Sequence, residues 1–268
     1  MSELPRPVTL SSLQRLRQQG EKIAVLTAYD AGFARLAEQA GVDVVLVGDS
    51  LGMVVQGHAS TLPVRLAEMS YHTRCVARAV RRALIVADMP FASFQQSPPQ
   101  AYAAAARLMA AGANVVKLEG GAVMLETVRF LVERGIPVCA HLGLLPQSVN
   151  QLGGYKVQAR DASGASQLLS DARALEQAGA GLLVLESIPA ALGKQVTETL
   201  RIPTIGIGAG PDCSGQVLVM HDVLGVYPEP PRFSKNFMAE GGSIQGAFRA
   251  YVAAVKSGAF PGPKHSFQ

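Results

Sequence analysis

The chain repeats one arrangement of hydrophobic and polar positions. Short runs rich in Val, Ile and Leu, without apolar/polar alternation, are each followed by a turn and an Ala- and Leu-rich stretch with helical periodicity. A continuous apolar run is typical of a strand that is buried on both faces, as in a parallel sheet. Eight such runs span residues 23–30, 42–50, 83–90, 114–120, 137–144, 180–189, 203–210 and 216–225.

The stretches between these runs are predicted to be helices. The clearest cover residues 31–41, 100–113, 122–135 and 165–180. Several end in Gly just before the next apolar run, which is typical of a helix C-terminus. Eight strand–helix units without a Pro-, Ser- or charge-rich linker predict one domain and favour a closed (β/α)₈ TIM barrel over an open sheet. The last run could be partly helical.

The predicted domain takes in residues 1–268. It begins with a short amphipathic helix, and the stretch 243–260 predicts a helix that closes the barrel, followed by an extended tail. Barrels of this class commonly reach about 250 residues as one unit. With 49% apolar and 16% charged residues, the chain can form a sizeable core.

Composition argues against several classes of partner. The net charge is +4, basic residues are scattered, aromatics make up 6% and Trp is absent, so we expect no nucleic-acid partner. No apolar run approaches the roughly 18–20 residues that span a bilayer, and we expect no membrane partner. The N-terminal stretch lacks a signal-peptide pattern and the three Cys are widely spaced, so we expect a cytoplasmic protein.

Acidic residues recur where the predicted strands end. In a parallel barrel the active site is built at the C-terminal ends of the strands. Asp49, Asp88 and Glu119 come from three successive runs, so their oxygens can meet over one point. Converging carboxylates repel one another unless they share a proton or a cation. Hard oxygen ligands favour Mg²⁺, although other divalent metals would also fit.

Lys117 precedes Glu119 by two residues, so both side chains face the same side of a strand. A Lys beside a metal and carboxylates suits an anionic substrate. Other polar residues allow structural interpretations. We assign Asp30, directly before a helix, to an N-cap. His141 could equally be a core histidine. The GIGAG run (206–210) could bind phosphate or simply allow close backbone packing.

Longer motifs carry a family resemblance. These motifs are LVGDSLGMVVQGHASTLPV (46–64), VADMPF (86–91), AGANVVKLEGG (111–121), PVCAHLGLLPQSVNQLGGYKVQAR (137–160) and LLVLESIP (182–189). On them, and from about residue 8 to its end, the chain resembles the ketopantoate hydroxymethyltransferase (3-methyl-2-oxobutanoate hydroxymethyltransferase) family. Small departures occur at Leu145, Ala159 and Ser214, where the family often has Thr, Gly and an acidic residue.

The resemblance implies a TIM barrel of the phosphoenolpyruvate/pyruvate-binding superfamily type. It also implies hydroxymethyl transfer from 5,10-methylenetetrahydrofolate to 3-methyl-2-oxobutanoate, giving 2-dehydropantoate in pantothenate biosynthesis through a metal-stabilised enolate. Asp49 and Asp88 are then ligands of one Mg²⁺ per subunit, Glu119 completes the site directly or through water, and Glu186 is the catalytic base. The residues expected to hold the keto acid are Asp49, Ser50, Asp88, Lys117, His141 and Tyr29. Family members assemble as homo-oligomers, typically homodecamers.

Three alternative functions stay open at this point. A metal-free aldolase would use Lys117 as a Schiff base, but the surrounding carboxylates should keep that amine protonated. A metal-dependent lyase acting on another small 2-oxo acid generally needs a catalytic Cys loop, and none of the three Cys lies in a suitable one. A non-catalytic barrel that binds a small ligand would have no need of this set of buried charges.

Overall fold

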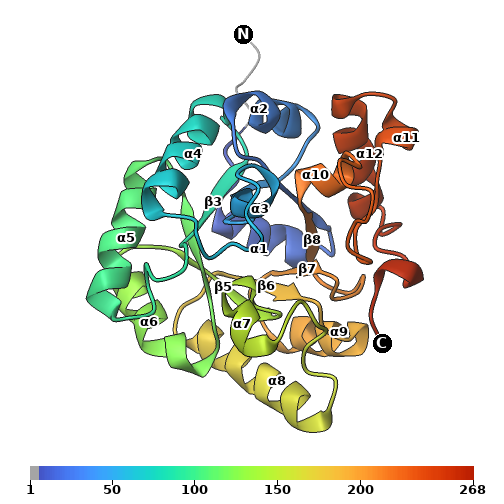
Figure 1. Ribbon diagram of the computed structural model, residues 1–268. Helices are drawn as coiled ribbons and strands as arrows, with labels where there is room; N and C mark the ends of the chain where they lie inside the picture. Colours follow the sequence, from blue (N-terminus) through green and yellow to red (C-terminus); the bar gives the residue numbers. More distant parts are fainter. Residues whose placement is uncertain (1–5) are drawn as a thin grey trace.

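The computed structural model describes residues 6–268, and its centre is a closed barrel of eight parallel strands in sequential order (Figure 1). The first strand pairs in parallel with both the second and the eighth, which closes the sheet. This confirms the predicted (β/α)₈ fold. The strands are β1 (Ile23–Thr27), β2 (Val44–Val47), β3 (Leu84–Asp88), β4 (Val115–Glu119), β5 (Val138–Gly143), β6 (Leu182–Glu186), β7 (Thr204–Ile207) and β8 (Gly215–Leu218).

Helices cover the outside of the barrel (Figure 1). The longer ones are α1 (Leu10–Gln18), α2 (Ala31–Gln39), α4 (Leu66–Ala79), α5 (Pro98–Ala110), α6 (Leu125–Glu133), α8 (Ala162–Gln177), α9 (Ala190–Thr199) and α12 (Ile244–Lys256). The short ones are α3 (Leu51–Val54), α7 (Val149–Leu152), α10 (Met220–Val223), α11 (Met238–Gly241) and the 3₁₀ turns η1 (Ala122–Met124), η2 (Pro146–Ser148) and η3 (Pro263–His265). Within residues 6–268, no helix combines the length and the apolar character needed to cross a bilayer.

Polar side chains begin several of these helices. The Asp30 carboxylate accepts hydrogen bonds from the backbone N–H groups of Gly32 and Phe33, at 2.7 and 3.0 Å, which confirms its predicted N-cap role. Asp161 caps α8 and Ser243 caps α12 in the same way. Each cap satisfies amide groups that the first helical turn leaves without a partner.

The strands direct alternate side chains into the barrel. Val86, Val115, Cys139 and Val184 belong to an inner apolar cluster that is separate from the core beneath the helices. Because side chains alternate with a period of two, the next inward positions lie two residues further along each strand. These positions hold Asp88, Lys117, His141 and Glu186. The barrel is therefore apolar in its lower layers and charged at its C-terminal mouth.

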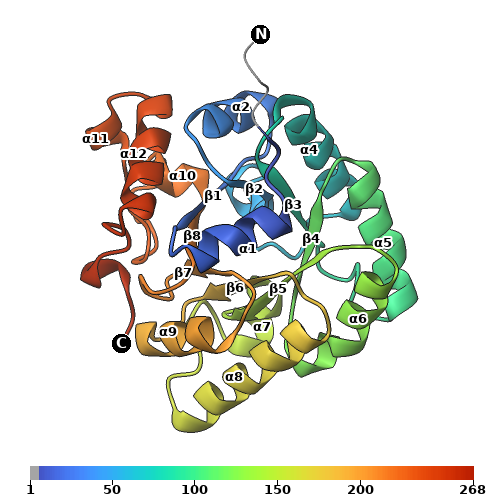
Figure 2. The same cartoon turned by 180° about the vertical axis from the view of Figure 1, so that it is seen from behind.

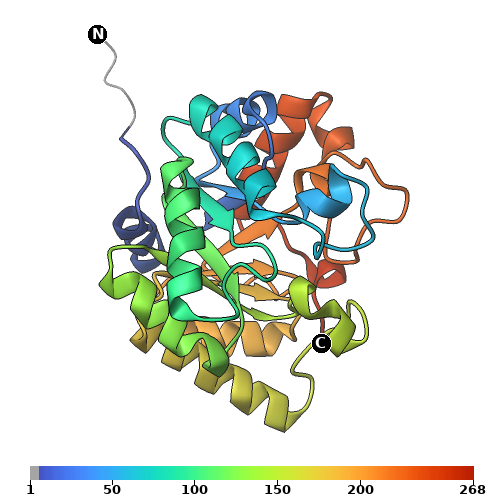
Figure 3. The same ribbon diagram turned by 60° about the vertical axis from the view of Figure 1, so that its left-hand side comes forward.

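Helix α1 closes the opposite end of the barrel. Its residue Leu13 is fully buried and belongs to the inner cluster, against which Val8, Leu10 and Leu16 also pack. Figure 2 shows α1 lying across the strands, and Figure 3 shows it on the side of the barrel opposite α3 and α7. The interior is thus sealed at the N-terminal end of the strands.

The last predicted run is partly helical, as the sequence analysis allowed. It forms a strand only as far as Leu218, and α10 follows, so the pair His221 and Asp222 lies in a short helix. The tail differs from its prediction, because it is not simply extended. It contains η3, and the Phe267 carbonyl accepts a hydrogen bond from Ala190 N–H at 2.9 Å at the start of α9.

Candidate active site

Strand register brings the predicted polar residues together at the mouth. Asp88 on β3 is paired with Lys117 on β4, and Glu119 on β4 with His141 on β5. Lys117 Nζ lies 2.9 Å from Asp88 Oδ1, and both side chains are almost completely buried. Burial alone would lower the pKa of Lys117, but the charges of the neighbouring carboxylates outweigh it and raise that pKa above its usual range. Lys117 is therefore a fixed positive charge.

His141 lies between two carboxylates. Its Nδ1 is 3.5 Å from Glu119 Oε1, and its Nε2 is 3.3 Å from Glu186 Oε2, although the second contact is not aligned as a hydrogen bond. Burial and the nearby Lys117 charge lower the pKa of His141, but the two carboxylates outweigh them and raise it. The predicted partnership of His141 with the site is thus present in the structure, and the imidazole links Glu119 to Glu186.

Close packing of two strands brings Glu186 to this position. Gly143 on β5 is paired with Glu186 on β6, and Gly143 has a positive φ of 92°. A Cβ atom there would lie 2.2 Å from the Glu186 carbonyl oxygen, so only glycine fits. The Glu186 side chain is 14% exposed, more than those of its acidic neighbours at this mouth. Glu186 therefore lies at the boundary between the buried charges and the opening.

Asp49 follows β2 and faces the same cluster. Its backbone N–H donates to Asp88 Oδ2 at 3.0 Å, and its Oδ2 accepts a hydrogen bond from Gln147 Nε2 at 2.8 Å. Burial and the negative charges of Asp88 and Glu119 raise the pKa of Asp49 well above its usual range. An ionised Asp49 therefore needs positive charge beyond what Lys117 supplies.

Ser50 and Tyr29 lie beside this cluster. The Tyr29 hydroxyl is 2.9 Å from Ser50 Oγ, and the Tyr29 backbone carbonyl contacts His72 Nδ1 at 2.6 Å. The Ser50 side chain does not cap the short helix that follows it, α3. The hydroxyl of Ser50, the residue directly after Asp49, is therefore held by Tyr29.

The donor atoms of Asp49 and Asp88 fit a hard divalent cation. In each carboxylate one oxygen accepts a hydrogen bond, from Gln147 or from the Asp49 backbone. The buried Asp88 Oδ1 has an ion-pair partner but no aligned hydrogen-bond donor. Mg²⁺ commonly binds through one or two carboxylates and completes its octahedron with water and substrate oxygens. Asp49 and Asp88 could supply those two carboxylates.

Glu119 is less available as a direct ligand. Its Oε2 accepts the Gln147 backbone N–H at 3.0 Å, while its Oε1 faces His141. Burial would raise the pKa of Glu119, but His141, Lys117 and this amide outweigh it and lower that pKa. Across residues 6–268, no three His, Cys, Asp or Glu side chains stand together as a metal-binding group. The assignment of Asp49, Asp88 and Glu119 as three ligands stays a prediction.

Two residues of the mouth were not predicted. Gln147 in η2 is buried and contacts both Asp49 and Glu119. Tyr155 is half-exposed, and burial together with the charges of Glu186, Asp49 and Glu119 raises its pKa. The signal for Gln147 was an amide directly after the strand that carries His141, but a lone Gln in a turn has no distinctive spacing.

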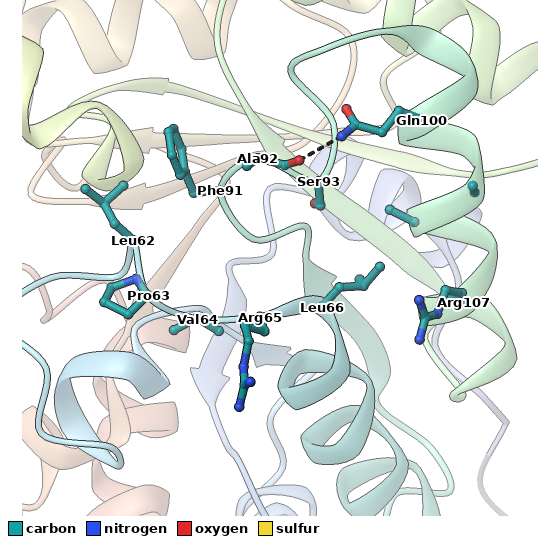
Figure 4. Close-up of a pocket in the computed structure, with 12 residues that line it drawn as sticks. Leu62, Pro63, Val64, Arg65, Leu66, Phe91, Ala92, Ser93, Gln100 and Arg107 are labelled. Atoms are coloured by element: carbon teal, nitrogen blue, oxygen red, sulfur yellow. Dashed lines mark hydrogen bonds between the residues drawn. The ribbon is translucent and has the colours of Figure 1, made fainter.

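Two other features lie apart from this chemistry. A cavity of about 490 Å³ opens between the N-terminal part of α4 and α5, where Arg65, Phe91 and Gln100 line it (Figure 4). None of the predicted site residues lines this cavity. The GIGAG run is explained by packing, because a Cβ at Gly210 would lie 2.5 Å from Ala190 Cβ.

Comparison with known proteins decides the family. The ketopantoate hydroxymethyltransferase model matches residues 7–263. The chain is 71% identical to the 3-methyl-2-oxobutanoate hydroxymethyltransferase of Thiobacillus denitrificans, over 97% of this chain and 100% of that protein. It is 63% identical to the enzyme of the same name from Methylobacillus flagellatus, again over 97% of this chain and 100% of the relative. The chain belongs to the ketopantoate hydroxymethyltransferase family.

Solved structures place this hydroxymethyltransferase family member in a wider fold group. A phosphonopyruvate hydrolase complex with oxalate and Mg²⁺ aligns with a TM-score of 0.61 at 15% identity, covering 96% of this chain and 93% of the other. The 2,3-dimethylmalate lyase, a member of the PEP mutase/isocitrate lyase superfamily, aligns with a TM-score of 0.58 at 19% identity, covering 80% and 81%. At these identities the likeness shows the fold alone, an eight-stranded α/β barrel.

Proposed function

We propose that this chain transfers a hydroxymethyl group from 5,10-methylenetetrahydrofolate to 3-methyl-2-oxobutanoate, giving 2-dehydropantoate in pantothenate biosynthesis. The names of its close relatives support the reaction. One observation carries the chemistry: the buried Asp88–Lys117 pair and Asp49 lie beside a His141–Glu186 contact at one barrel mouth. The first three groups suit a chelated 2-oxo acid, and the last two suit proton removal.

Asp49 and Asp88 would hold one Mg²⁺, or another divalent metal in its place, per subunit. Glu119 would contribute through a water, because both its oxygens already have protein partners. When bound, the metal supplies a Lewis acid that polarises the 2-oxo group and makes the C3 proton more acidic. The related fold of phosphonopyruvate hydrolase, solved with oxalate and Mg²⁺, offers a precedent for a metal and a small dianion in such a barrel.

The protein's own groups hold and deprotonate the keto acid. Lys117, kept protonated by its neighbours, pairs with the substrate carboxylate. Ser50, with Tyr29 behind it, donates a hydrogen bond from the side of β2. Glu186 accepts the C3 proton, and His141 Nε2 lies 3.3 Å from its Oε2 on the side of the buried charges. The carbanion at C3 then forms a bond to the one-carbon unit. If water has first hydrolysed both C–N bonds of the folate, the carbon is that of formaldehyde, its C=O π bond opens and the alkoxide takes up a proton. If the carbanion attacks the folate iminium instead, water displaces the remaining nitrogen and supplies the hydroxyl oxygen, and tetrahydrofolate leaves in both cases.

Hydrogen–deuterium exchange at C3 tests this function without the folate. The keto acid is incubated with enzyme in D₂O, with Mg²⁺ or with a chelator, and the C3 proton is followed by NMR. Exchange that requires the dication supports the proposal. If exchange is as fast in the presence of the chelator, the metal has no part in proton removal and the mechanism is wrong.

The alternative functions are less favoured by the structure. Lys117 is held as an ammonium beside Asp88, whereas a Schiff base requires a neutral amine. Borohydride trapping with substrate should therefore leave the enzyme active. Cys139 and Cys213 are buried and Cys75 lies on α4, so none of them is placed on a mouth loop as a lyase cysteine.

We further propose a cytoplasmic homo-oligomer, with the homodecamer that the family resemblance implies. The chain's single (β/α)₈ domain over residues 1–268 is the repeating unit of that assembly. Sedimentation velocity of the purified protein tests the assembly, since ten subunits of 28.1 kDa differ greatly in mass from one.

A further inference from the structure

Gln147 connects the ends of several strands at the mouth. Its Nε2 donates to Asp49 Oδ2 at 2.8 Å and to the Met89 carbonyl, just past β3, at 2.9 Å. Its backbone N–H donates to Glu119 Oε2, at the end of β4, at 3.0 Å. Gln147 itself follows β5 and is 5% exposed. One residue thus contacts groups from β2, β3 and β4.

The orientation of the Gln147 amide is fixed by its partners. The Met89 carbonyl can only accept, so the atom that faces it must be the NH₂ group. On the other side Gln95 Nε2 donates to Gln147 Oε1 at 3.1 Å. Rotation of the amide would break three hydrogen bonds, one of them to a carboxylate, and would leave their buried partners unsatisfied. The side chain is therefore held in one orientation.

A neutral donor has a particular advantage between two carboxylates. Asp49 and Glu119 repel one another, and a Lys at position 147 would compensate that repulsion with a charge that competes with a bound cation. A Glu would add to the repulsion. An amide orients Asp49 Oδ2 and adds no charge, so the other oxygen of Asp49 keeps its full attraction for a cation.

We propose that Gln147 is a positioning residue that sets the affinity of the site for a divalent cation. Its side chain fixes Asp49 so that Oδ1 faces the cation, and its backbone N–H keeps Glu119 turned towards His141. This role rests on the proposed function, because it assumes that Asp49 is a ligand.

Binding of Mn²⁺ in the absence of substrate tests the proposal. Free and bound Mn²⁺ are measured by electron paramagnetic resonance for the wild type and for Gln147→Met, which keeps the length of the side chain but donates no hydrogen bond. We expect the dissociation constant for Mn²⁺ to rise about 10–100-fold, as is typical when a partner of a metal ligand is lost. The spectrum of bound Mn²⁺ should also change, because Asp49 is no longer held in one orientation.

Gln95→Met is the matched control, since it removes a hydrogen bond from the same network but leaves both donations by Gln147 Nε2 in place. We expect its Mn²⁺ affinity to stay within about threefold of the wild type. Gln147→Asn, which keeps the amide but is one methylene shorter, provides a second variant if Gln147→Met does not fold, and it should also bind Mn²⁺ more weakly. Circular dichroism and melting temperature without metal establish that each variant is folded.

Two results would overturn the proposal, and they differ. If the wild type binds Mn²⁺ and folded Gln147→Met binds it equally well with the same spectrum, Gln147 does not position the ligand and the metal site stands. If the wild type itself binds no Mn²⁺, the metal assignment in the proposed function fails, and the role of Gln147 fails with it.

Discussion

Two buried aspartates flank the short strand β2 and have opposite surroundings. Asp43, just before the strand, accepts the Ala24 N–H at 2.9 Å, and its carboxylate lies 2.5 Å from Lys256 Nζ and 3.9 Å from an Arg82 nitrogen. Asp49, at the other end, faces two further carboxylates. The closed end of the barrel neutralises its charge with the protein's own cations, whereas the mouth is left short of positive charge. This difference separates residues that stabilise the fold from residues that suit a bound cation.

The largest expected effect is at the mouth. Glu186→Gln should lower turnover about 10²–10⁴-fold, because the amide cannot accept the C3 proton. The melting temperature should stay close to that of the wild type, since the side chain is partly exposed. Steady-state rates and C3 exchange measure the first effect, and calorimetry measures the second. Activity within a few-fold of the wild type would make His141 the next candidate for the base.

A divalent cation should reverse which of two proteins, the wild type or Asp49→Asn, is the more stable. Its raised pKa means that the stability associated with the protonated carboxyl is present below about pH 4 and is lost as the pH rises. Metal-free Asp49→Asn should therefore be more stable than the wild type at pH 7.5. Mg²⁺ at 100 times its dissociation constant should stabilise the wild type by about 2.7 kcal/mol and the variant hardly at all. Urea unfolding with and without Mg²⁺ gives these four values, and equal stabilisation of both proteins would count against Asp49 as a ligand.

At the closed end of the barrel, replacing an Asp by Asn should destabilise the protein, whereas metal-free Asp49→Asn is expected to be stabilised. Asp43→Asn removes the partner of Lys256 and Arg82 and should lower the free energy of unfolding by about 1–3 kcal/mol. Turnover per folded molecule should not change, because β2 and the apolar layers inside the barrel separate Asp43 from the mouth. Urea midpoints and rates at 25 °C distinguish the two ends, and a loss of turnover without a loss of stability would contradict the comparison.

Asp222 provides the smallest and most pH-dependent effect. Burial raises the pKa of this carboxyl from 3.8 to about 6. The contribution of protonated Asp222 to the free energy of unfolding is therefore lost as the pH rises from about 4 to about 6, and it does not change further above that range. Asp222→Asn should raise the free energy of unfolding by about 1–2 kcal/mol at pH 7.5, and the gain should shrink towards pH 4.5. A gain that is the same at both pH values would show that ionisation is not its cause.

Much of the architecture could be predicted from the sequence because both strand burial and helix periodicity leave a local pattern. The strands, the longer helices and the cap at Asp30 follow from that pattern. The acidic residues at strand ends were also visible, since charge after an apolar run is unusual. The partly helical character of the last run was also visible, but its exact boundary at Leu218 and the contact of Phe267 with Ala190 depend on tertiary packing, which periodicity does not encode.

The parts of the site that were missed have no such pattern. Gln147 matters through hydrogen bonds to residues that are distant in sequence, and Tyr155 through its position near the mouth. Ala159 is instructive in another way. The family resemblance implied Gly at this position, and the structure gives Ala159 a φ of 54°, in the left-handed region that favours glycine. The position where the sequence departs from the expected Gly therefore has an unusual backbone conformation. The sequence alone did not reveal that conformation.

The seal formed by α1 has a consequence for the order of events. Leu13 and the apolar layers fill the N-terminal end of the barrel. Under the proposed function, the keto acid and the one-carbon donor therefore both enter through the C-terminal mouth. The side chains of Asp88 and Lys117 are less exposed to solvent than that of Glu186, so this pair lies deeper in the mouth. Under the proposed function, the keto acid therefore binds before the one-carbon donor, and its hydroxymethylated product leaves last.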